Sequence, residues 1–122
     1  MSALELLTAE LRERLLANGR EPGQDHLPIV KLFNPAGPAT WLATELDSDG
    51  DILFGLADLG MGCPELGSFS LAELAALRLP FGLRIERDRF FSTDRALSVW
   101  ADAARTAGSI AGAERFLATV RS

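Results

Sequence analysis

The sequence predicts an α+β fold with a small, mainly antiparallel sheet. Two strand-like runs, 40–46 and 51–57, flank the residues DSDG, and Asp-Gly between two such runs is a strong signal for a β-hairpin. Leucines at helical spacing indicate a helix near the N-terminus, and two amphipathic helical stretches follow residue 93. Because a tight hairpin joins antiparallel strands, a purely parallel α/β sheet does not fit.

The first predicted element is a helix that begins at the N-terminus. Ser2 and Glu5 have the spacing of a capping box, and Asn18-Gly19 supplies the C-terminal stop. One apolar stripe runs along this helix: Leu4, Leu7, Leu11 and Leu15. A polar connector over 20–28, with two prolines, leads into a short predicted strand at 29–33.

The second run of the hairpin is apolar on both faces, so we expect a central strand covered on each side. A glycine-rich loop follows it. Ser70 and Glu73 then form a second capping box, with Phe69 and Leu74 placed as a hydrophobic staple. These signals predict a short helix over 71–78.

The last third of the chain predicts one strand and two helices. Charges fall on both sides of the strand-like stretch 81–91, as is typical of an exposed sheet edge. Ser92 or Thr93 is expected to cap a helix over 94–107 that ends at Gly108, and a final helix spans 110–120. The predicted order is helix, three strands, helix, strand and two helices, in a single domain over 1–122.

Composition and charge exclude several classes of protein. The longest apolar runs are far shorter than the roughly 20 residues that span a bilayer, and the early acidic residues do not fit a signal peptide. The single cysteine excludes a disulfide framework and a multi-thiolate zinc site. We therefore expect a cytoplasmic protein without a membrane or cofactor requirement.

The net charge of −5 is unevenly distributed. Residues 26–77 carry one basic and seven acidic side chains, whereas residues 78–122 carry eight basic and five acidic ones. We expect the two parts to neutralise one another within the fold or between copies. The basic residues lack the clustering and aromatic interleaving of a nucleic-acid interface, so direct nucleic-acid binding is not expected.

The stretch ADLGMGCPELG, residues 57–67, invites a catalytic or phosphate-binding interpretation. The spacing of Gly60, Gly62 and Gly67 matches neither a dinucleotide-binding nor a phosphate-loop motif, so a structural loop with positive-φ glycines is expected. Cys63 has no basic neighbour in sequence between Lys31 and Arg78, which favours a small buried hydrophobe over a nucleophile.

Acidic residues offer two further candidates. Asp47, Asp49 and Asp51 have the spacing of calcium-loop ligands, but Ile52 occupies the position that needs glycine, which favours a solvated turn. Asp58, Glu65, Glu86 and Asp88 remain as a possible metal-binding or acid–base cluster. The competing interpretation pairs Asp58 or Glu86 with Lys31, Arg84 or Arg87.

Three segments, VKLFNPAGPATWLATELDSDGD, FGLADLGMGCPELGSFSLAEL and PFGLRIERDRFF, resemble a bacterial family known as domain of unknown function 2958. The resemblance covers about residues 26–105. It implies a small protein or module that is often encoded on plasmids and conjugative elements near antirestriction-type genes, with no assigned activity. The family's motif positions fall on Lys31, Phe33, Thr40, Trp41, Glu45, Asp58, Gly60, Gly62, Pro64, Glu65, Gly67, Glu86, Arg87 and Asp88. Relatives carry a hydrophobic residue in place of Cys63, which weakens a role for the thiol.

The function that we expect is a non-enzymatic protein-binding module, with loop 58–67 and strand 84–88 as the recognition surface. One version of this function is a module that mimics DNA and thereby inhibits a defence nuclease. The suspected binding residues are Lys31, Asp58, Gly60, Gly62, Glu65, Glu86, Arg87 and Asp88. The alternative is a small hydrolase or metal-dependent enzyme that uses the four carboxylates, with Arg87 as anion clamp. A homodimer through the C-terminal helices would bury the faces that bear Trp100 and Phe116.

Overall fold

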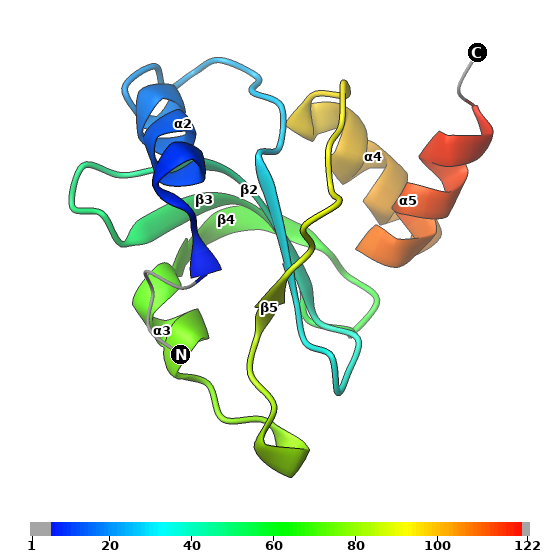
Figure 1. Cartoon of the computed structure of the whole chain (residues 1–122). Coiled ribbons are helices and arrows are strands. Elements are labelled where there is room, and N and C mark those ends of the chain that lie inside the picture. The colour runs from blue at the N-terminus through cyan, green and yellow to red at the C-terminus, as the bar shows by residue number, and fades with distance from the viewer. Residues whose placement is uncertain (1–5, 121–122) are drawn as a thin grey trace.

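The computed structural model describes residues 6–120 and is built around a five-stranded antiparallel sheet (Figure 1). The strands are β1 (Val30–Phe33), β2 (Thr40–Leu46), β3 (Ile52–Asp58), β4 (Glu65–Ser70) and β5 (Glu86–Arg87). The helices are α2 (Ala9–Gly19), α3 (Leu71–Ala76), α4 (Leu97–Ala107) and α5 (Ile110–Thr119), with the 3-10 turn η1 at Pro80–Gly82. The strand order is β4-β3-β2-β1-β5, and the expected α+β class is confirmed.

Helices cover both faces of the sheet. Leu15 of α2 and Leu71 and Leu74 of α3 share one apolar core with Leu32, Trp41 and Leu53 of the strands. Trp100 of α4 and Ile110 and Leu117 of α5 share a second core with Leu42 and Leu56. Figure 1 shows the α4–α5 hairpin on the opposite side of the sheet from α2 and α3. Because successive strand residues point to opposite faces, β2 and β3 contribute to both cores, which explains why β3 is apolar up to Ala57.

The β2–β3 hairpin forms as predicted, and its acidic turn is held by its own backbone. The Asp49 carboxylate accepts hydrogen bonds from the backbone N–H of Asp51 at 2.8 Å and of Ile52 at 3.1 Å. These two hydrogen bonds hold the pKa of Asp49 below its ordinary value. Gly50 takes a positive φ of 77°, which closes the turn.

Within the described residues, the helix that the leucine stripe predicts is not continuous. Ser2 and Glu5 lie outside the described residues, and α2 begins after Thr8, whose hydroxyl accepts a hydrogen bond from the N–H of Leu11. The chain bends at Leu7, so Leu7 and Leu11 do not share one continuous helix. The predicted end at Gly19 is confirmed.

Two assignments in the second half of the chain were wrong in extent. Residues 65–70 form the strand β4, where the sequence predicts loop, while the predicted strand 81–91 is reduced to Glu86–Arg87 after η1. The edge position of β5 agrees with the prediction. Ser70 caps α3 as predicted, because its hydroxyl accepts from the N–H of Glu73.

The start of α4 was also wrong. Neither Ser92 nor Thr93 caps it, since the helix begins at Leu97 without a side-chain cap from its own flank. Its first N–H groups donate instead to the connector after α2. Leu97 donates to the carbonyl of His26 at 2.9 Å, and Ser98 donates to the carboxylate of Asp25 at 3.0 Å. Thr93 accepts from the indole N–H of Trp100 at 3.1 Å, which holds that ring in the core.

Candidate functional site

One transverse row of the sheet brings distant parts of the chain together. Glu86 pairs with Phe33, Phe33 with Thr40, and Thr40 with Asp58. Directly paired residues of antiparallel strands have their side chains on the same face. The row therefore places β5 and the loop after β3 at the same end of the sheet, although Glu86 comes 28 positions after Asp58 in the sequence.

Asp58 is buried at this end, with only 2% of its surface exposed. One carboxylate oxygen accepts from the N–H of Gly60 and the other from the N–H of Ile110, each at 2.9 Å. Ile110 is the first residue of α5, where the helix dipole favours a negative charge. The carboxylate thus ties the glycine loop to the start of α5.

The loop over residues 59–64 has a left-handed backbone that favours glycine at two positions. Gly60 and Gly62 have φ angles of 85° and 81°, as expected for a structural loop. At Gly60, a Cβ atom would lie 2.3 Å from Cγ of Pro38, so this loop packs closely against the turn between β1 and β2. The two glycines and the close contact with Pro38 therefore fix the path of this loop.

The side chains of this loop are apolar and, apart from the buried Pro64, exposed. Leu59 is 56% exposed and Met61 is 73% exposed. Cys63 is exposed as well, so the expectation of a buried cysteine was wrong; the positive-φ backbone at Gly62 turns it outward with the rest of the loop. Apolar residues between glycines, outside any alternating pattern, are the sequence signal for this exposure, and the prediction of a buried Cys63 overlooks it.

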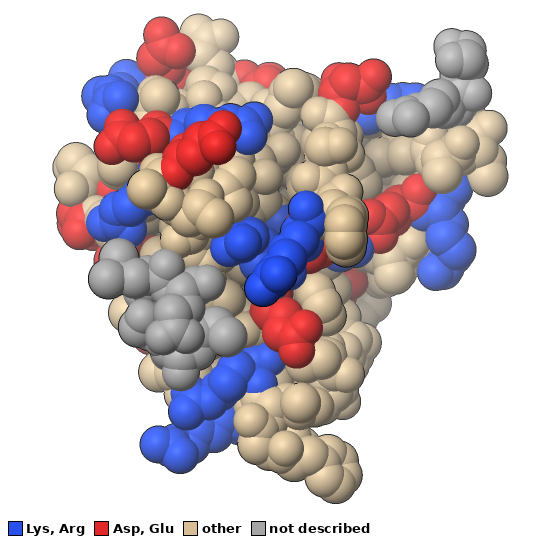
Figure 2. Space-filling view, viewed as in Figure 1, with Lys and Arg blue, Asp and Glu red and all other residues tan. Residues whose placement is uncertain are grey.

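Beside the loop lies an open groove of about 670 Å³. Four predicted site residues line it, namely Lys31, Glu86, Arg87 and Asp88. Pro38 also lines the groove and contacts the position of Gly60, so the groove and the loop adjoin. Phe90, 95% exposed, contributes to its rim. On the face seen in Figure 2, positive and negative side chains lie next to one another over the region of β5.

Lys31 is the central cation of the groove. Its ammonium donates to the Glu114 carboxylate at 2.8 Å and lies 3.7 Å from the Asp88 carboxylate, with the lysine side chain 16% exposed. It therefore connects β1, the end of β5 and α5. The Arg87 guanidinium donates to the carbonyl of Leu6, so it is engaged with the N-terminal segment. Lys31, rather than an arginine, forms the salt bridges of this region.

The structure does not bring the four candidate carboxylates into one site. Glu65 lies on β4 and Glu86 on β5, at opposite edges of the five-stranded sheet. Asp58 is buried between them and uses both of its oxygens. Among residues 6–120, no group of three or more His, Cys, Asp or Glu side chains could hold a metal ion.

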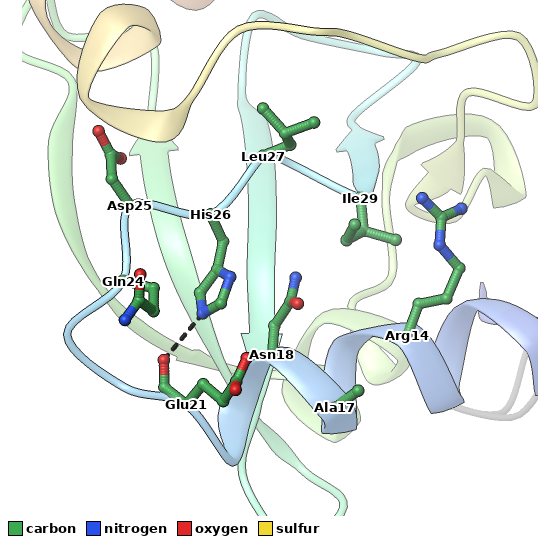
Figure 3. Close-up of a pocket in the computed structure, with 9 residues that line it drawn as sticks. All are labelled: Arg14, Ala17, Asn18, Glu21, Gln24, Asp25, His26, Leu27 and Ile29. Carbon is green, nitrogen blue, oxygen red and sulfur yellow. Dashed lines mark hydrogen bonds between the residues drawn. The ribbon is translucent and has the colours of Figure 1, made fainter.

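A second hollow, of about 710 Å³, lies between the end of α2 and the connector (Figure 3). His26 extends toward the carbonyl of Glu21, with 2.9 Å between Nε2 and that oxygen, while Asp25 is directed toward the start of α4. Asn18 donates to the carbonyl of Thr44. Hydrogen bonds from the hydroxyl and N–H of Ser98 lower the pKa of Asp25, with a smaller contribution from His26. These polar groups serve the packing of the connector and do not converge on a reactive centre.

The comparisons with known proteins agree with the resemblance. A family model described as Protein of unknown function (DUF2958) matches residues 6–111. Searches of curated proteins and of solved structures gave no match. No helix within residues 6–120 is long and apolar enough to cross a membrane. The match extends from the first described residues to the beginning of α5 and covers most of the chain, and the chain therefore belongs to the DUF2958 family.

Proposed function

We propose that this chain is a non-enzymatic protein-binding module. Its binding surface, here called the loop-end surface, consists of loop 59–64, turn 34–38 and the groove beside β5. The observation that supports it most is the exposure of Leu59 and Met61 on a backbone held by Asp58. Apolar side chains presented on a fixed loop bind a partner with little loss of conformational entropy. A partner would bury them and remove them from water.

The adjoining groove adds charges of both signs to this surface. Glu86 and Arg89 are exposed there, and Lys31 and Asp88 lie deeper. Mixed charges give orientation and specificity to a contact between two proteins. They favour a protein partner over a nucleic acid, whose phosphates would need a positive surface.

A narrower form of the proposal comes from the family resemblance to proteins of bacterial mobile elements. In that form, the partner belongs to a host defence system that the module inhibits. The mixed charges of the groove support direct contact with such a protein. They support DNA mimicry less, because a mimic of DNA needs a densely acidic surface.

The alternative proposal of a small hydrolase or metal-dependent enzyme has less support. An active site needs its acid, base and electrophilic groups around one concave pocket. Glu65 and Glu86 lie on opposite sheet edges, and the hydrogen bonds of Asp58 go to the protein's own backbone.

The test is affinity capture from a bacterial lysate with three forms of the tagged protein. The forms are the unaltered chain, the variant Leu59→Ser/Met61→Ser, and a control, Leu77→Ser/Val120→Ser, that removes exposed apolar side chains elsewhere. We expect one stoichiometric partner with the unaltered chain and the control, and its loss with the loop variant. Retention by the loop variant, or no partner for the unaltered chain, would contradict the proposal.

A further inference from the structure

The strand β4 presents an open edge of the sheet. It pairs with β3 along its whole length, from Glu65 to Ser70, and no strand of the described chain pairs with its other side. The N–H of Leu71 donates to the carbonyl of Asp51 at 2.9 Å, in the register of this ladder. Because backbone groups alternate in direction along an antiparallel strand, those of Gly67 and Phe69 face β3. Those of Leu66 and Ser68 face away from the sheet.

This edge lacks the features that commonly prevent pairing with another strand. Natural edges are protected by charged residues, proline, bulges or a covering segment. Within β4 the one charged residue is Glu65, at its first position, and there is no proline. The register between β3 and β4 runs without a bulge, and Glu65, Leu66 and Ser68 are exposed. The edge is therefore open to strand addition.

We propose that β4 pairs with β4 of a second copy, about a twofold axis at Ser68 that is perpendicular to the sheet. Such an axis keeps each face of the sheet on the same side in both copies. It places the outward backbone groups of Ser68 opposite those of its counterpart, and Leu66 opposite Ser70. Outward-facing donors then meet outward-facing acceptors, and the two sheets join edge to edge.

The side chains of β4 suit this self-pairing. The register places Gly67 opposite Phe69 of the second copy, and a Cβ at Gly67 would find no heavy atom within 4 Å. An aromatic ring opposite a glycine fills the space that the glycine leaves. Glu65 would lie beyond the paired segment, so the two copies do not place acidic side chains opposite each other. This complementarity of the strand with itself favours a second copy over an unrelated peptide.

The loop-end surface takes no part in the pairing, so this inference stands apart from the proposed function. The expected homodimer through the C-terminal helices loses one of its two contacts, because Trp100 is buried within one chain and is unavailable to a partner, while Phe116 is exposed.

The first experiment measures molar mass in solution, by light scattering across a range of micromolar concentrations. Ser68→Pro removes the one N–H at the centre of the edge and leaves the ladder to β3 intact, because that N–H faces outward. Ser68→Ala keeps the N–H and is the matched control. We expect dimers for the unaltered chain and Ser68→Ala, and monomers with an unchanged circular dichroism spectrum for Ser68→Pro.

The second experiment does not depend on how well the proline variant folds. In a Cys63→Ser background, Ser68→Cys places two thiols opposite each other at a Cα separation of about 5.5 Å, which suits a disulfide. We expect rapid oxidation to a covalent dimer, and none with Ser48→Cys in the exposed hairpin turn. A monomeric unaltered chain, a folded Ser68→Pro variant that remains dimeric, or equal cross-linking of the two cysteine variants would each overturn the proposal.

Discussion

Asp58 shows how one buried side chain can shape a surface that it does not itself expose. Replacing it with alanine leaves the N–H groups of Gly60 and Ile110 without their acceptor. An unsatisfied buried N–H costs about 1–3 kcal/mol, which applies to Ile110, whereas the exposed Gly60 can donate to water, so Asp58→Ala should lower the free energy of unfolding by about 2 kcal/mol. Asp58→Asn keeps one acceptor oxygen and should lose roughly half as much. Urea unfolding of the two variants measures this difference, and equal stabilities would show that the acceptor oxygen kept by Asn contributes nothing.

The lowered pKa of Asp25 predicts that the free energy of unfolding depends on pH. Folding lowers the pKa of its carboxyl below the ordinary value of 3.8, because Ser98 donates to it twice. A lowered pKa in the folded state gives stability that is fully present above the ordinary value. That stability is lost as the pH falls through the lowered value. Asp25→Ala should therefore cost about 1 kcal/mol at pH 7 and progressively less below pH 3.8.

Thermal unfolding from pH 7 to pH 3 measures this loss as a difference between the unaltered chain and Asp25→Ala. Asp25→Asn is the control, because its amide oxygen can still accept from the N–H of Ser98 without titrating. If the difference for Asp25→Ala stays constant down to the most acidic pH, the ionised carboxylate is not what stabilises α4.

These residues also show which caps the sequence could predict. Ser70 and Ser109 lie next to the helices that they cap, so local spacing was sufficient to find Ser70 and the start at residue 110. Asp25 and His26 accept from the first N–H groups of a helix that begins more than 70 positions later, and no local pattern connects them to it. Thr93 had the spacing of a cap, but its hydroxyl is used by Trp100.

At the scale of elements, the hairpin was predictable, whereas β4 was missed and β5 was predicted too long. Asp-Gly between apolar runs specifies β2 and β3 locally. The residues of β4, ELGSFS, have weak strand propensity and follow a loop that contains Gly60 and Gly62, so only pairing with β3 makes them a strand. In the same way, β5 consists only of the two residues that pair with β1. The alternation of charge over 81–91 therefore predicted a longer strand than the one that forms.

The close contact between β2 and β3 gives a prediction for Gly55. A Cβ there would lie 1.8 Å from the carbonyl oxygen of Leu42, so an alanine forces the two strands apart. Overpacking of this kind costs about 1–3 kcal/mol, and Gly55→Ala should lose at least about 2 kcal/mol of unfolding free energy. Gly67→Ala on the open edge is the control and should lose nothing, measured at a concentration that keeps the chain monomeric. Equal losses at the two glycines would contradict the close approach at Leu42.

At the scale of the whole molecule, strand order decides which candidate residues meet. Lys31, Glu86, Arg87 and Asp88 line one groove because β5 pairs with β1. Glu65 lies apart from them because β4 pairs with β3 at the other edge. The hairpin signal fixes one pair of neighbouring strands, so the sequence alone could name these residues but could not group them.

Helix α5 stabilises both the sheet and the loop after β3. The family match ends at residue 111, yet α5 buries Ile110, Ala113 and Leu117 against the sheet and supplies the N–H that Asp58 binds. Leu117→Ala should therefore cost about 2–3 kcal/mol of unfolding free energy, since it leaves a cavity under α5. Arg115→Ala, on the exposed side of the same helix, should stay within about 0.5 kcal/mol of the unaltered chain. Denaturant unfolding of both variants tests this. A neutral Leu117→Ala would mean that α5 packs too loosely to stabilise the sheet or to hold the loop after β3.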